Sequence, residues 1–188
     1  MEVLFKNIRA KIKLTDEAKG FLNEISTERI VNKNEILIKE GKAVNHVYFV
    51  LSGCFRAYMI DKTGKQHTLQ FAIGDWWISD WNAVFMGENA KLTVEAIVDS
   101  NVVEFKHDQL MEIYRRFPEF EPYQRKNLER HVVSLNERIL GLLQLPAIER
   151  YNLFLQTYPG VYQIAKDSHI ASFLGITPQS LSRLKTGE

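Results

Sequence analysis

Up to about residue 108, hydrophobic and polar residues alternate in short runs separated by turn residues. Alternation of this kind predicts β-strands, and the Gly, Asp and Asn residues between the runs predict tight turns. The predicted strands cover 36–38, 46–51, 54–60, 67–71, 92–98 and 102–105. Many short strands at regular spacing are typical of a small antiparallel barrel or roll. A helix over residues 15–25, opened by Thr15 as a capping residue, is expected before them.

After residue 108 the hydrophobic residues recur with the period of an α-helix. We expect Asp108 to cap a short helix, and a long helix to follow through about Leu143. Another helix should span residues 147–158, with Arg150 and Tyr151 near its outer surface.

The change from strands to helices predicts an α+β fold, in which an antiparallel, jelly-roll-like β-roll precedes a set of helices. We place a roll domain at 1–117, a long helix at 118–143 and a terminal helical domain at 144–188.

Five apolar residues in the long helix recur at alternating spacings of four and three. They are Leu128, Val132, Leu135, Ile139 and Leu142. This is the seam of a two-stranded coiled coil, so the helix is expected to form a dimer. The alternative is a helix packed on its own roll, because the pattern covers only about two heptads.

The segment 166–185 has the pattern of two short helices joined by a glycine. Ile170 and Leu174 can form the buried stripe of the first helix, and Gly175 allows a tight turn. Thr177 is a suitable N-cap for the second helix, whose Leu181 would face the core. This is the signature of a helix-turn-helix.

The outer face of the second helix carries side chains suited to a DNA major groove. Gln and Arg make bidentate contacts with base edges, and Ser and Lys commonly bind phosphates. The candidate DNA-binding residues are Thr177, Gln179, Ser180, Ser182, Arg183 and Lys185. The alternative is an ordinary helical hairpin with a solvated polar face.

Charge and composition limit the remaining choices. The net charge of +1 gives no global basic signal, although residues 125–188 hold eight Lys or Arg against five Asp or Glu. The absence of a long apolar run and of a signal-peptide pattern predicts a cytoplasmic protein without a membrane segment. The single Cys54 excludes an internal disulfide and a cysteine-built metal site within one chain.

A metal enzyme on a cupin-like barrel is the main hypothesis from another class. The five histidines are scattered, and the chain has no HExxH, no GxSxG and no Gly-rich phosphate loop. We therefore predict no catalytic residue, no metal site and no enzymatic activity.

Together these motifs resemble the Crp/Fnr family of transcription regulators. The resemblance rests on residues 47–53 of the roll, on Gly74 and Asp75, and on the long helix followed by the helix-turn-helix. The resemblance covers nearly the whole chain. Residues 74–80 are similar to a divergent subgroup of short regulators within the family.

The resemblance implies a homodimeric, sequence-specific regulator, controlled allosterically through a cyclic nucleotide-binding-like roll. It implies double-stranded DNA with a palindromic operator as one partner and RNA polymerase as another. By the family pattern, Gln179, Ser180 and Arg183 would contact bases. The remaining candidates, Thr177, Ser182 and Lys185, would lie nearer the phosphates.

In the family, a Gly-Glu pair holds the ribose of the effector and an Arg-Ser pair binds its cyclic phosphate. Gly74 and Asp75 match the first pair, but Ala90 and Lys91 stand where the second is expected. A lysine cannot reproduce the planar fork of a guanidinium. We therefore expect an effector other than cyclic AMP, or none.

The candidate effector pocket consists of Gly74, Asp75, Trp76, Trp77, Ala90 and Lys91. The tryptophans, with Trp81, would either line a cavity for an unidentified small molecule or fill the roll as packing. Asp75 and Asp80 are interpreted as turn or capping carboxylates. A further alternative is a β-roll ligand sensor, or a protein-interaction module, whose terminal helices bind a protein partner.

Overall fold

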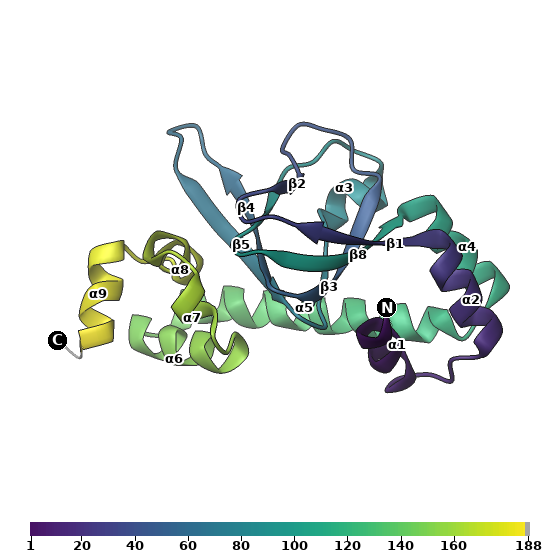
Figure 1. The fold of residues 1–188 in the computed structure, drawn as a ribbon. Coiled ribbons are helices and arrows are strands. Elements are labelled where there is room, and N and C mark those ends of the chain that lie inside the picture. The colour runs from purple at the N-terminus through teal and green to yellow at the C-terminus, as the bar shows by residue number, and fades with distance from the viewer. Residues whose placement is uncertain (187–188) are drawn as a thin grey trace.

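The centre of the computed structural model, which describes residues 1–186, is a roll of two four-stranded antiparallel sheets (Figure 1). The first sheet has the order β1 (Ser26–Val31), β8 (Ser100–Lys106), β3 (His46–Ser52) and β6 (Trp77–Ile78). The second has the order β2 (Ile36–Ile38), β7 (Thr93–Ala96), β4 (Cys54–Ile60) and β5 (Gln66–Ile73). The predicted α+β class with an antiparallel roll is confirmed.

The interior of the roll is filled by side chains that alternate inward along the strands. Val50, Phe55, Ala72 and Val94 are fully buried between the sheets. At Gly53 a side chain would not fit, because its Cβ would lie 2.1 Å from Ser100 Oγ and φ is +90°.

All six predicted strands exist, but two strands and several helices were not predicted. Strand β1 begins with the polar run Ser-Thr-Glu-Arg, and β6 is only two residues long. The helices without a prediction are α1 (Glu2–Arg9), α3 (Trp81–Met86) and α7 (Val161–Ile164).

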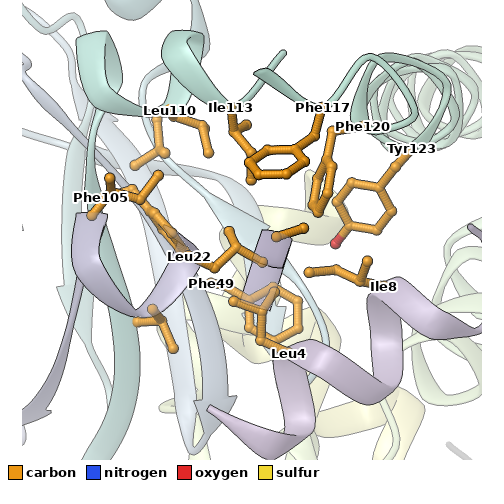
Figure 2. Close-up of a cluster of buried hydrophobic side chains, with 14 of the residues drawn as sticks. Leu4, Ile8, Leu22, Phe49, Phe105, Leu110, Ile113, Phe117, Phe120 and Tyr123 are labelled. Carbon is orange, nitrogen blue, oxygen red and sulfur yellow. The ribbon is translucent and has the colours of Figure 1, made fainter. Parts of the chain in front are cut away.

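The N-terminal helices cover one side of the roll. Figure 2 shows α1, α2 (Asp16–Ile25), α4 (His107–Arg116) and the start of α5 (Phe120–Gln144) meeting around β3 and β8 through buried apolar side chains. Thr15 Oγ1 accepts from the Ala18 amide at 3.2 Å, which confirms the predicted cap of α2. The predicted cap at Asp108 is wrong, because α4 begins at His107 and Asp108 lies in its first turn.

The long helix α5 runs along the roll, and α6 (Ala147–Thr157), α8 (Asp167–Leu174) and α9 (Pro178–Thr186) gather near its end (Figure 1). Arg150 and Tyr151 are not on the outer surface of α6, contrary to prediction. Tyr151 is buried, and Arg150 Nε donates to Leu174 O at 3.0 Å, so this face of α6 packs on α8. Over residues 1–186, no helix has both the length and the apolar character needed to cross a bilayer.

Candidate functional site

Helices α8 and α9 form the helix-turn-helix that the sequence predicts. Gly175 joins them with a φ of +68°, and a Cβ at this position would lie 2.8 Å from Leu142 Cδ2 of α5. Thr177 Oγ1 accepts from the Ser180 amide at 3.1 Å, so the predicted N-cap of α9 is confirmed. Leu181 is fully buried and fixes the inner face of α9.

The opposite face of α9 is polar and turned to solvent. Gln179, Ser182 and Arg183 are exposed, and Ser180 is half-buried beside the Thr177 hydroxyl, 3.0 Å from it. Within residues 1–186, the Arg183 guanidinium makes no hydrogen bond or ion pair. An uncommitted guanidinium beside an amide side chain can contact base edges.

Lys185 behaves differently from its neighbours on α9. Its Nζ forms an ion pair with Asp167 at the first position of α8. The pair ties the two helices together and partly neutralises the lysine. A phosphate contact by Lys185 would therefore compete with Asp167.

The predicted dimer seam of α5 lies largely at the surface of the single chain. Val132 and Ile139 are 54% and 51% exposed, Leu135 and Leu142 are also exposed, and Leu128 is half-buried. Exposed apolar stripes are typical of interaction surfaces. Because Leu142 also contacts the Gly175 turn, the stripe reaches the helix-turn-helix.

The six candidate effector residues do not share one site. Asp75, Trp76 and Trp77 line a pocket of about 600 Å³ between the roll and α5. In the described part of the chain, the lining of this pocket does not include Gly74, Ala90 or Lys91. Ala90 is buried in the roll, and Lys91 Nζ pairs with Glu88 at 2.8 Å.

The three tryptophans pack in three different places. The Trp77 ring lies 5.3 Å from Phe49 in the core beneath α1. Trp76 lies 5.4 Å from Tyr158 at the end of α6, and Trp81 stacks on Phe85. All three also contribute to the rim of the pocket, so they combine packing with pocket lining.

Asp80 is a buried carboxylate that is held by main-chain amides, two of them at Lys91 and Leu92. Its side chain is 1% exposed, and Oδ2 accepts from the amides of Lys91 and Leu92 at 2.7 and 2.9 Å. Oδ1 accepts from the Ala83 amide and caps α3, as expected of a capping carboxylate. These donors are already satisfied by an internal negative group, which opposes the approach of a phosphate.

Lys11 and Asn127 line the pocket, although the sequence indicated neither residue, and both belong to a hydrogen-bond network with Asn7. Lys11 Nζ donates to Asn7 Oδ1 and Asn127 Oδ1 at 2.8 and 2.9 Å, and Tyr123 Oη donates to Asn7 Oδ1 at 3.0 Å. Burial lowers the pKa of Lys11 and raises that of Tyr123 to about 12. The network joins α1 to α5, and the Trp77 indole donates to it through Tyr123.

Within residues 1–186, no group of three or more His, Cys, Asp or Glu side chains has a geometry that could hold a metal ion. Cys54 is fully buried, and burial raises the pKa of its thiol to about 12.

Comparison with known proteins finds a matching family of domains and relatives of similar sequence. Residues 28–117 match the family described as the cyclic nucleotide-binding domain. An anaerobic regulatory protein of Pasteurella multocida is 24% identical over 174 residues, which are 86% of this chain and 63% of that protein. The chain thus spans less than two thirds of the length of this relative.

Solved structures share the fold. FixK2 of Bradyrhizobium japonicum superposes with a TM-score of 0.73 at 21% identity, covering 87% of this chain and 84% of that one. A structure from Eubacterium rectale, described as a transcriptional regulator of the Crp/Fnr family, gives a TM-score of 0.72 at 16% identity. This superposition covers 93% of this chain and 83% of the Eubacterium rectale chain.

Proposed function

We propose that the chain is a regulator of the Crp/Fnr type, which forms a homodimer and binds specific sequences of double-stranded DNA. In this proposal the roll, residues 1–117, senses a signal, and residues 118–143 form the dimer helix. Residues 144–188 bind DNA, with Gly187 and Glu188 outside the described residues.

The observation that carries the proposal is the outer face of α9. It presents Gln179 and Arg183 to solvent, while Leu181 holds the helix against its support. We assign base contacts to Gln179, Ser180 and Arg183, and phosphate contacts to Thr177, Ser182 and Lys185.

The dimer part of the proposal is supported by the exposed stripe on α5. Two copies of this stripe would bury each other, as the a and d residues of a coiled coil do. A two-fold dimer would present two copies of α9 to half-sites about one helical turn apart, which calls for a palindromic operator.

We propose that the effector, if one acts, is not cyclic AMP. Support comes from the missing arginine at Ala90 and from Asp80, which already accepts from the amides of Lys91 and Leu92. The pocket lined by Asp75, Trp76 and Trp77 is separate from Ala90 and Lys91, and it would suit an unidentified small molecule. RNA polymerase would be the partner through which DNA binding changes transcription.

Selection from random duplex DNA at one fixed salt concentration tests the proposal. We expect enrichment of a palindrome with half-sites about one turn apart, and the same enrichment with and without cyclic AMP. If no sequence is enriched under any condition while the terminal helices capture a protein, the alternative of a protein-interaction module replaces the proposal.

A further inference from the structure

The pocket of about 600 Å³ between the roll and α5 has three indole rings in its lining. Trp76, Trp77 and Trp81 come from the segment that leads from β5 into α3, and all three are half-buried. Indoles offer flat apolar faces on which an aromatic ring can stack. The volume is in the range of pockets that hold small organic molecules.

Lys11 supplies a fixed positive charge to this pocket. Its Nζ donates to Asn7 Oδ1 and Asn127 Oδ1 at 2.8 and 2.9 Å, and these bonds use two of the three hydrogens of the ammonium group. Both acceptors are neutral amide oxygens. The ammonium is therefore held in place without being neutralised, and its third hydrogen has no partner within residues 1–186.

The positive charge lies close to one of the indoles. The Trp77 indole donates to Tyr123 Oη at 3.2 Å, and Tyr123 Oη donates to the Asn7 oxygen that also accepts from Lys11. The pocket thus combines an aromatic surface with a cation at the end of one hydrogen-bond network.

Cations without a partner are in excess in the lining. Lys11, Lys126 and Arg130 all line the pocket, and within residues 1–186 none of them forms an ion pair. Burial, and then the charge of Arg130, lower the pKa of Lys11, whereas Asp75 acts in the opposite direction. A further negative charge beside Lys11 would relieve this repulsion.

The acidic side chains of the lining compensate only part of this charge. Glu129 already pairs with Arg125, so Asp75 and Glu137 are the carboxylates of the lining that have no ion pair within residues 1–186. His131 is uncharged near neutral pH, because burial lowers its pKa. Three unpaired cations against two unpaired carboxylates leave one net positive charge in the pocket.

We propose that this pocket binds a small aromatic carboxylate, with its ring among the tryptophans and its carboxylate beside Lys11. The carboxylate would accept a charge-assisted hydrogen bond from the free hydrogen of the ammonium group. One negative charge matches the net charge of the lining. A phosphate monoester carries nearly two negative charges and would be repelled more strongly by Asp75 and Glu137.

The inference names a ligand class for the pocket to which the proposed function assigns an effector. It rests on that function only for the consequence of binding. Binding itself needs neither DNA nor a dimer, so it is measured on the protein alone. A negative result here would leave the selection of DNA sequences unaffected, and a failed selection would leave the pocket unaffected.

Calorimetric titration of the full-length protein, without DNA and at one fixed salt concentration, tests the proposal. Naphthoate and naphthamide have the same ring and differ in charge. We expect one naphthoate per chain, bound at least about tenfold more tightly than naphthamide, because only the carboxylate forms a charge-assisted bond. Naphthyl phosphate should bind more weakly than naphthoate.

Substitutions at the cations assign the preference to the pocket. Lys11→Met should reduce the preference for naphthoate to less than about twofold, and Lys11→Arg should retain most of it. The matched control is Lys13→Met, which removes the same charge from an exposed residue of the same segment, outside the lining of the pocket.

Arg130→Met gives a second test, because Lys11→Met also leaves two amide oxygens without their donor. Arg130 is exposed and makes no hydrogen bond within residues 1–186, so its loss should not disturb the fold. We expect the preference for naphthoate to fall about threefold in this variant. Thermal melting shows which variants are folded.

Four results would overturn the proposal. They are equal affinities for naphthoate and naphthamide, no binding of either probe at about 1 mM, tighter binding of naphthyl phosphate than of naphthoate, and a preference that is unchanged in Arg130→Met and in folded Lys11→Met.

Discussion

The β-roll and the C-terminal helices differ in how completely each buries its apolar side chains and pairs its polar ones within one chain. The interior of the roll is closed, with Phe55, Val94 and Val102 fully buried. The helices leave an apolar stripe on α5 and a polar face on α9, and Arg138 Nε and His169 Nδ1 are buried without a protein partner within residues 1–186. The roll therefore buries its apolar side chains within one chain, whereas the C-terminal helices leave apolar and polar surfaces on which the proposed dimer and DNA contacts depend.

Matched Phe→Ala substitutions test the comparison with the largest expected effect. Phe55→Ala should lower the free energy of unfolding by about 3–5 kcal/mol, because it opens a cavity inside the roll. Phe173→Ala should instead loosen the contact of α8 with Phe71 of the roll. The buried Cys54 of the same cluster should then react with a maleimide below the main unfolding transition. Denaturant titration with parallel labelling measures both, and equal behaviour of the two variants would remove the distinction.

The stripe on α5 is tested by a charge in the seam. Ile139→Asp should raise the dissociation constant of the dimer at least about tenfold, because an unpaired carboxylate would be buried between two helices. Leu140→Asp is the control, since Leu140 is equally exposed at 51% but lies outside the seam. Sedimentation measures the oligomeric state, and equal effects of both variants would argue against the predicted seam.

The contact of α8 with the roll should also respond to pH. Burial, together with Arg56 and Lys166, lowers the pKa of His169 to about 4. When His169 is exposed to water its pKa is near 6.5, so the contact is most stable above pH 6.5 and weakens as the pH falls toward 4, by at most about tenfold per unit. Labelling of Cys54, normalised to unfolded protein at each pH, measures this.

The control for the pH prediction is His169→Gln, which keeps a polar side chain but does not titrate. Its labelling should lose the dependence between pH 6.5 and 4. Retention of the full dependence would assign the effect to another group.

The smallest effect concerns Lys185. Lys185→Ala should weaken binding to all DNA sequences similarly. It should also reduce the slope of log affinity against log salt concentration by about one. Asp167→Asn should strengthen binding to random DNA about twofold, because it releases Lys185 from its ion pair and removes a negative charge. Affinity measured across a salt series distinguishes the two, and a loss confined to one sequence would contradict a phosphate contact.

Local patterns made much of the fold predictable from the sequence. Alternation identified six strands, and the capping chemistry of Thr15 and Thr177 located two helix starts. Strand β1 was not predicted because its first four residues are all polar, so the sequence shows no alternation of apolar and polar positions there. The cap predicted at Asp108 was wrong because aspartate, which often caps helices, is also favourable in the first turn of a helix.

The candidate site was predictable only where it is local. The polar face of α9 comes from one segment, so its spacing alone shows it. The pocket combines Lys11, Trp77 and Asn127 from three distant segments, and Asp80 meets the Lys91 amide only after α3 has turned the chain. No pattern in the sequence predicts such contacts. The hydrogen bond from Arg150 to Leu174 O was missed for the same reason.

The central claim is that α9 reads DNA sequence, and Arg183→Ala tests it most directly. Affinity is measured at one fixed salt concentration for a selected palindrome and for a scrambled duplex of equal length. We predict a loss of about 1–3 kcal/mol on the palindrome and little change on the scrambled duplex. Equal losses on both duplexes would contradict base reading by Arg183 and reduce its role to charge.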